Sequence, residues 1–249
     1  MSDLSETIDQ VMADSPFKYG LLIESDGQTL AEHDSRQAFP SASLIKLAVL
    51  NAVLDSKVDL DQLIHVSSDK LVGGAGILQL MSNRSWKLGD LLALMISVSD
   101  NSATNLVISL MGMAQIQAYL ETRDFKQTKL ERYLMDGRAL ATGHDNQTSA
   151  AESLLLLQQA LSPGPEIQNW FRNQQFRYKL PGNFDESSEK VVVYNKTGEG
   201  NLIDHDVARI VYNNHFVDVA MLTLGSLNRM ATLQKFNQVG QAIVDWLAE

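Results

Sequence analysis

Hydrophobic residues near the start of the chain predict one helix followed by two strands. In residues 4–13 they recur at helical spacing on one side, which is typical of an amphipathic helix. Two short apolar runs follow, residues 17–24 and 29–32, and the Asp26-Gly27 pair between them favours a hairpin turn. The start of the chain therefore predicts a mixed α/β arrangement.

The middle of the chain, from residue 59 to about residue 162, shows mostly helical spacing. Ser149 lies three residues before Glu152, which is the spacing of a capping box at a helix start. The run from Gly73 to Gly76 contains three glycines and predicts a flexible loop. The predicted helices of this stretch cover residues 88–98, 103–113, 114–121 and 149–161.

Strand patterns return in the last third of the chain. Residues 190–195 predict a strand that runs on into residues 196–198, and residues 206–212 and 216–224 predict an antiparallel pair. Residues 227–247 predict a closing amphipathic helix. Both ends of the chain are thus mixed α and β, and the middle is helical.

The most hydrophobic predicted helix starts at Ser43 and runs to residue 54. It is apolar on nearly every side, which indicates a buried helix, and Pro40 and Ser41 before it are residues typical of helix starts. Ser43 and Lys46 share one face of it, one turn apart. A lysine buried there is costly unless paired or neutral, and burial lowers its pKa, as a lysine base requires. The alternative is a lysine that reaches the surface from the helix end.

The Ser43–Lys46 spacing alone is weak, because Ser-x-x-Lys occurs four times in the chain. Ser15 precedes a proline turn, and the matches that begin at Ser67 and Ser187 lie in polar stretches that predict solvated turns. Ser43 is the match in an apolar helix. Two further motifs follow it in order along the chain, Ser99-Asp100-Asn101 and Lys196-Thr197-Gly198.

This ordered trio resembles the motifs of the class A β-lactamase-like serine hydrolases, in the superfamily of β-lactamases and penicillin-binding proteins. The resemblance implies an antiparallel sheet flanked by helices, with an inserted helical lobe. Residues 1–42 and 163–249 would form a mixed α/β lobe and residues 43–162 an all-helical lobe. The active site would lie in the cleft between the two lobes.

The resemblance also implies four catalytic residues. Ser43 would be the nucleophile that forms an acyl-enzyme, and Lys46 would take or relay its proton. Ser99 would pass that proton to the leaving nitrogen or oxygen, and Lys196 would supply positive charge. Apart from the resemblance, Ser99 could cap a helix and Lys196 could be a solvated strand end.

Substrate binding would involve five residues by the same resemblance. Asn101 would orient the substrate amide; apart from the resemblance, it could simply hold a turn. Thr197 would bind a substrate carboxylate together with Lys196. The backbone N–H groups of Ser43 and Glu199 would form the oxyanion hole, beside Gly198. His205 stands roughly where relatives place a cationic residue for the carboxylate, but a histidine on a strand surface is the ordinary alternative.

The chain departs from the family pattern at one position. Class A β-lactamases carry a loop resembling Arg-x-Glu-x-x-Leu-Asn, whose glutamate activates the hydrolytic water; here Arg132 matches, but Leu134 stands in place of the glutamate. Leucine cannot move a proton, and general-base catalysis contributes about 10²–10⁴-fold. Asp136, or less favourably Glu131, could substitute, and both could be plain surface charge. We therefore expect an enzyme that is acylated but hydrolyses penicillins poorly.

The composition of the chain disfavours several classes of binding partner. The net charge of −10 disfavours nucleic acid and anionic membranes, and no apolar run is long enough for a membrane span. The chain has no cysteine, and its five histidines show no metal-ligand spacing, so we expect no metal and no cofactor. The expected partner is a small molecule with an acyl group and a carboxylate.

Location and activity class stay open at this point. Residues 1–12 lack the basic and apolar regions of a signal peptide, so we expect a cytoplasmic protein, or an exported one whose leader has been removed. Within the serine hydrolases, β-lactamase, D-alanyl peptidase and esterase activities all fit. A non-catalytic binding module that keeps the fold is the competing class, and a structural protein is a third that no feature supports.

Overall fold

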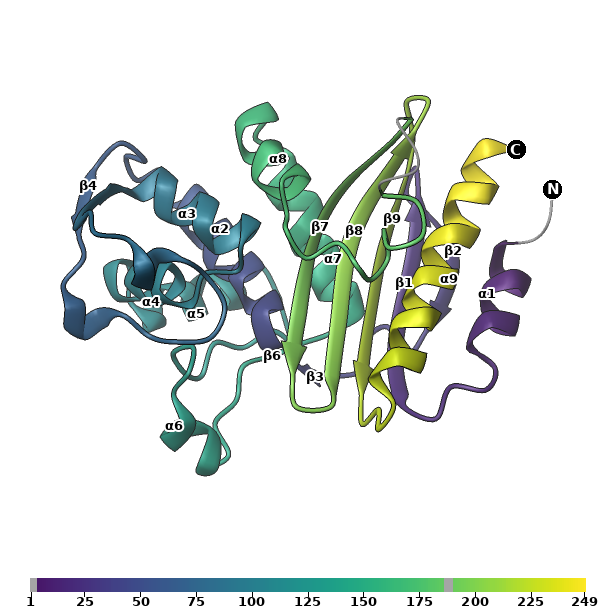
Figure 1. Ribbon diagram of the computed structural model, residues 1–249, viewed down its shortest axis with the longest axis horizontal. Coiled ribbons are helices and arrows are strands. Elements are labelled where there is room, and N and C mark those ends of the chain that lie inside the picture. The colour runs from purple at the N-terminus through teal and green to yellow at the C-terminus, as the bar shows by residue number, and fades with distance from the viewer. Residues whose placement is uncertain (1–3, 186–189) are drawn as a thin grey trace.

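A computed structural model describes residues 4–185 and 190–249 of the chain. Its centre is a five-stranded sheet in the order β2-β1-β9-β8-β7, in which all neighbouring strands are antiparallel (Figure 1). The strands are β1 (Lys18–Ser25), β2 (Gln28–His33), β7 (Val191–Gly200), β8 (Ile203–Tyr212) and β9 (His215–Leu224). The predicted antiparallel sheet is confirmed.

Helices cover both faces of this sheet. On one side lie α1 (Leu4–Met12) and α9 (Arg229–Ala248), which also pack against each other (Figure 1). On the other side α7 (Ala150–Leu161) lies between the sheet and α2 (Ile45–Asp55). The remaining helices are α3 (Leu88–Ser97), α4 (Asn101–Met111), α5 (Met113–Thr122), α6 (Gly137–Ala141) and α8 (Pro165–Arg172).

Alternation along the strands divides the core in two. In β1, Leu21 and Ile23 belong to the cluster under α1 and α9, whereas Leu22 between them belongs to the cluster on the opposite face. In β9, Met221 belongs to the cluster under α1 and α9, and Leu222 belongs to the cluster on the opposite face. Successive side chains of a strand point to opposite faces, so the sheet is buried on both sides.

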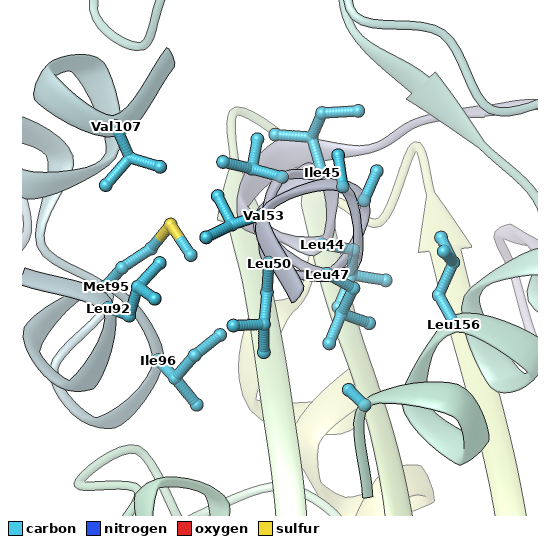
Figure 2. Packing of buried hydrophobic residues seen from close by; sticks show 14 of the residues in the cluster. Leu44, Ile45, Leu47, Leu50, Val53, Leu92, Met95, Ile96, Val107 and Leu156 are labelled. Atoms are coloured by element: carbon cyan, nitrogen blue, oxygen red, sulfur yellow. The ribbon is translucent and has the colours of Figure 1, made fainter. Parts of the chain in front are cut away.

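Helix α2 lies at the centre of the larger core cluster. Figure 2 shows its residues Leu50 and Val53 directed toward α3, while Leu156 of α7 lies on the opposite side. Nine of its residues are buried, including Lys46. A helix that is hydrophobic all round needs neighbours on every side. This packing fixes the start of α2, and with it Ser43 and Lys46, relative to the sheet.

The middle of the chain differs from the expected all-helical segment of residues 43–162 in two ways. It contains two short strands that pair antiparallel, β4 (Leu63–His65) and β5 (Ser85–Lys87), and β6 (Gln147–Thr148) pairs with β3 (Phe39–Pro40). These strands are too short to produce a recognisable alternation. Helix α8 was not expected either, although Pro165 at its first turn is a typical helix start.

Candidate active site

Ser43 lies in a 3₁₀ turn, Ala42–Leu44, directly before α2. Lys46, in the first turn of α2, is fully buried. Its Nζ lies 3.0 Å from Ser43 Oγ, close enough for proton transfer between the two groups. The expected pairing of the serine and the lysine on one helix face is therefore present in the structure.

Three further oxygens surround the Lys46 amine. Its Nζ lies 2.6 Å from the Ser99 carbonyl oxygen, 2.9 Å from Ser99 Oγ and 2.9 Å from Asn101 Oδ1. Burial, and then the nearby charge of Lys196, hold the Lys46 pKa well below its usual value, against the opposing charge of Asp100. The lowered pKa makes the neutral amine more accessible than it is in an exposed lysine.

A neutral Lys46 amine has two N–H groups and one lone pair. The Ser99 carbonyl and Asn101 Oδ1 can only accept, so they take the two N–H groups. The lone pair is left for a hydroxyl proton, and the hydroxyls of Ser43 and Ser99 both lie within reach. The arrangement can therefore take a proton from a serine.

The Ser99 motif stands at the junction of α3 and α4 in a strained conformation. Ser99 has a φ of +53°, which is uncommon for a residue other than glycine. Asp100 next to it is the N-cap of α4, and its carboxylate also accepts the N–H groups of Ile77 and Leu78 at 2.7 Å. These bonds tie the loop of residues 73–78 to the motif and hold Ser99 in place.

Gly76 explains why this loop can approach so closely. Its φ is +107°, and a Cβ atom there would lie 2.3 Å from Asp100 Cγ. The Asn101 N–H donates to the Ala75 carbonyl at 3.0 Å, and Asn101 Nδ2 donates to the Gly73 carbonyl at 3.2 Å. The glycine-rich loop thus forms one wall beside the Ser99 motif.

Lys196 of β7 reaches the same cluster from the sheet. Its Nζ lies 3.1 Å from Ser99 Oγ and 2.9 Å from the Thr197 carbonyl. Burial, followed by the charge of Lys179, lowers the pKa of Lys196 to about 7, although Asp206 and Glu199 oppose the shift. Ser99 Oγ is therefore flanked by two lysines.

The cluster forms the floor of a cleft of about 490 Å³. Five of the expected site residues line this cleft, namely Ser43, Ser99, Asn101, Thr197 and Glu199. Lys46, Lys196 and Gly198 are buried beneath its surface. Gly198 is packed closely, since a Cβ atom there would lie 3.1 Å from the Ser41 carbonyl oxygen. Elements from distant parts of the chain thus meet around Ser43.

The structure does not bring His205 to the cleft. The side chain is fully buried, and its Nε2 lies 2.8 Å from the Pro40 carbonyl oxygen, while the Thr223 N–H donates to Nδ1. Burial lowers the pKa of His205 to about 4, against the opposing hydrogen bond to Pro40. The neutral ring bridges β8 to the segment before Ser43, and it carries no positive charge toward the cleft at neutral pH.

The opposite wall of the cleft is formed by residues 130–146, which we call the Ω segment. Arg132 Nε pairs with Asp145 Oδ1 at 2.8 Å and closes the segment on itself. Leu134 lines the cleft, and its N–H and carbonyl both bond to the side chain of Asn105, at 2.8 and 3.0 Å. Leucine at this position is therefore firmly held.

The two carboxylates of the Ω segment differ in position. Asp136 lines the cleft, but its Oδ1 accepts the N–H groups of Arg138 and Ala139, each at 3.0 Å, and so caps α6. Glu131 is exposed and is absent from the described lining of the cleft. The carboxylate nearer the cleft thus serves a helix cap.

Several contributors to the site were not foreseen from the sequence. Phe176 lines the cleft, and Lys179 is a fully buried lysine behind β7. Each lies in a segment with no motif, although an isolated lysine before Leu180-Pro181 could have drawn attention. Among residues 4–185 and 190–249, no group of three histidine, aspartate or glutamate side chains is arranged to hold a metal ion. Within the same ranges, no helix has the length and hydrophobicity to cross a bilayer.

Comparison with solved structures identifies proteins of the same fold. The β-lactamase from Sphaerobacter thermophilus superimposes with a TM-score of 0.84 at 23% identity, over 99% of this chain and 97% of that chain. A class A β-lactamase representative from Bacteroides cellulosilyticus gives a TM-score of 0.85 at 23% identity, over 98% and 97% of the two chains. A leucine-to-glutamate mutant of PBP-A, as an acyl-enzyme complex with penicillin G, gives 0.83 at 22% identity, over 100% and 97%.

These solved structures show the fold, and the sequence itself shows the family. The model of the "Beta-lactamase enzyme family" matches residues 3–247, nearly the whole chain. The resemblance expected from the three motifs is thereby confirmed. The chain belongs to the beta-lactamase enzyme family, within the β-lactamase-like serine hydrolases.

Proposed function

We propose that the protein is a serine acyl-hydrolase that forms a covalent acyl-enzyme at Ser43 and turns over β-lactams slowly. The observation that carries the proposal is the buried Lys46, with its lowered pKa and its Nζ 3.0 Å from Ser43 Oγ. Burying a lysine in an apolar core costs free energy, so a lysine with a purely structural role is not expected beside a serine there. A lysine that accepts the serine proton needs both a lowered pKa and an Nζ within hydrogen-bond distance of the hydroxyl.

In the proposed acylation step, Ser43 Oγ attacks the acyl carbon and its proton passes to Lys46. The oxygen of the tetrahedral intermediate accepts the N–H groups of Ser43 and Glu199, which both line the cleft. The bond from the acyl carbon to the leaving nitrogen or oxygen then breaks. Ser99, which lies 2.9 Å from Lys46 Nζ, relays the proton to the leaving atom.

The same cleft would bind the rest of the substrate. We take it to lie between an α/β lobe of residues 1–42 and 163–249 and a lobe of residues 43–162. Asn101 would orient the substrate amide, and Lys196 with Thr197 would bind a carboxylate. His205 is left out of this set because it is buried and neutral. The substrate would be a small molecule that fits about 490 Å³.

Deacylation is the slow half of the proposed cycle. Leu134 lines the cleft at the position where the resemblance places a glutamate, and it has no group that could activate water. PBP-A, which shares the fold, has been captured as an acyl-enzyme with penicillin G in a leucine-to-glutamate mutant. This supports penicillin as a probe for Ser43. Leu134 also favours the second candidate function, a D-alanyl peptidase or esterase of the same fold.

The test is intact-protein mass spectrometry after incubation with benzylpenicillin. We expect a persistent adduct with the mass of the whole penicillin, because ring opening releases no fragment. Ser43→Ala should give no adduct. Ser67→Ala, in another Ser-x-x-Lys match, should be labelled like the natural protein.

Three results would change the proposal. Fast penicillin turnover would contradict slow deacylation and would require another base. Labelling of Ser43→Ala would remove Ser43 as the nucleophile. Binding without any covalent adduct, for penicillin and for simple acyl esters, would favour a non-catalytic binding module.

A further inference from the structure

A third lysine lies behind the strand that carries Lys196. Lys179 precedes β7, is fully buried, and is outside the described lining of the cleft. A buried ammonium is retained only where oxygen atoms replace its hydration. The oxygen atoms that surround Lys179 therefore indicate which part of the structure the lysine stabilises.

Four oxygens surround Lys179 Nζ. Two are backbone carbonyls, Gly198 O at 3.0 Å and His205 O at 3.1 Å, on the neighbouring strands β7 and β8. Two are carboxylates, Asp204 Oδ1 at 3.2 Å and Glu199 Oε1 at 3.3 Å. The ammonium therefore joins the two strands at the point where the Lys196-Thr197-Gly198 motif ends.

The bond to Gly198 O acts on one particular peptide group. That carbonyl belongs to the peptide unit whose N–H is on Glu199, and the described residues contain no cis peptide bond. In a trans peptide the carbonyl and the N–H point in opposite directions. With the oxygen directed at the buried lysine, the Glu199 N–H is directed away from it, and β7 is the edge strand of the sheet.

A cation at the carbonyl end also strengthens the N–H at the other end. Hydrogen-bonded groups in series polarise one another, and bonds that involve an ionised group are stronger than neutral ones. The Glu199 N–H is one of the two proposed oxyanion donors. An oxyanion donor is most effective when it is fixed before the negative charge develops.

We propose that Lys179 is a positioning residue for the oxyanion hole, acting through the Gly198–Glu199 peptide group. This inference rests on the proposed acyl-enzyme function. Lys179 touches neither substrate nor the reacting atoms. It holds the peptide plane and polarises the N–H that receives the oxyanion.

Arg229 provides a matched control. Its guanidinium pairs with the same two carboxylates, Glu199 Oε2 at 3.0 Å and Asp204 Oδ1 at 3.1 Å, but it is half-exposed and has no described bond to Gly198 O. If Lys179 acted only by holding the Glu199 side chain, Arg229→Met would have the same effect as Lys179→Met. If it acts on the peptide group, only the lysine variant matters.

The experiment compares the natural protein, Lys179→Met and Arg229→Met with benzylpenicillin in two measurements. Stopped-flow kinetics separates substrate affinity from the acylation rate constant. Infrared difference spectroscopy of the acyl-enzyme reports the ester carbonyl stretch, which falls as the oxyanion donors strengthen. For Lys179→Met we expect about a tenfold lower acylation rate constant, less than the 10²–10³-fold cost of deleting a donor. The carbonyl stretch should rise. At about pH 6 Lys196 is already mostly charged, so the affinity measured there should change little.

Arg229→Met should leave both the rate constant and the carbonyl stretch near the natural values. If Lys179→Met does not fold, Lys179→Met with Asp204→Asn neutralises one of the two carboxylates that lose the lysine, and the test is repeated on that variant. A folded lysine variant with natural acylation and an unshifted stretch would overturn the inference. A natural protein that forms no acyl-enzyme with penicillin or acyl esters would instead overturn the proposed function.

Discussion

The floor and the Ω wall of the cleft face the same substrate space but have opposite chemistry. On the floor, Lys46, Ser99 and Lys196 form a continuous chain of groups that can move protons, with every link at 3.1 Å or less. On the Ω wall, Leu134 lines the cleft where the resemblance places a glutamate, and Asp136 is engaged in capping α6. Under the proposed function, the floor would supply the groups for acylation, while the Ω wall would lack a group that activates water.

The two walls are also stabilised differently. The floor consists of buried polar groups that hydrogen-bond to one another, on a helix start held by apolar packing. Leu134 belongs to the large hydrophobic cluster and is additionally held through its backbone by Asn105. Substitutions on the floor should therefore alter function more than stability, and a polar substitution at Leu134 should alter both.

The largest effect is expected on the floor, from Lys46→Met. It removes the proposed base, and we expect the acylation rate to fall by about 10²–10⁴-fold. Because methionine has no charge to bury in an apolar site, the unfolding temperature should stay equal or rise. Acylation kinetics and thermal unfolding measure the two effects. A natural acylation rate in this variant would show that the base lies elsewhere.

On the Ω wall, Leu134→Glu should give the next largest change. A carboxylate facing the acyl-enzyme would activate water, and we expect loss of the penicillin adduct to accelerate by about 10²-fold, the lower end of general-base catalysis. Leu134→Gln has almost the same shape but cannot accept the proton, so its adduct should persist. Time-resolved intact mass gives both rates. Equal rates for the two variants would show that the wall does not limit deacylation.

The pH dependence of acylation tests the charge states of the two floor lysines without any mutation. Lys196, with a pKa of about 7, is charged below that pH and neutral above it. Between about pH 6 and about pH 8 its charged fraction falls about tenfold, and the affinity for a substrate carboxylate should fall with it. Lys46, whose pKa is lowered, loses its base function as the pH falls through that pKa. Acyl esters without a carboxylate should lack the alkaline fall, and an identical profile for both substrates would contradict the proposed role of Lys196.

The smallest effect is expected from Asp136→Asn on the Ω wall. Asparagine caps a helix as well as aspartate does but cannot act as a base, so deacylation should change by less than about twofold. Mass spectrometry of the adduct over time measures this. A marked slowing would identify Asp136 as the base that replaces the missing glutamate.

Most of the sheet and the long helices could be predicted from the sequence. Residues 206–212 and 216–224 were expected as an antiparallel pair, and they form β8 and β9 with the turn at Asn213 and Asn214, both at positive φ. The capping box was half correct. Ser149 Oγ accepts the Glu152 N–H at 3.2 Å, but the Glu152 carboxylate bonds to backbone N–H groups of residues 126–128 instead of closing the box.

The candidate site was also predicted only in part from the sequence. The sequence grouped Ser43, Lys46, Ser99, Asn101 and Lys196, and the structure brings these five residues into one hydrogen-bonded cluster. Their catalytic roles stay predictions until acylation is measured. Spacing could not show that His205 is buried under Gly198 and bonded to the Pro40 carbonyl instead of lining the cleft, because the exposure of a strand side chain depends on register and on what packs over it.

The sequence by itself determined the family, the antiparallel sheet, the buried helix and the order of the three motifs, because periodicity and short motifs are local properties of a chain. Only the tertiary structure decided which groups are charged and what they face. The pKa of Lys46, the neutral state of His205, the helix cap at Asp136 and the buried Lys179 all depend on neighbours far away in sequence. Desolvation and hydrogen bonding are properties of packing, and packing exists only once the chain has folded.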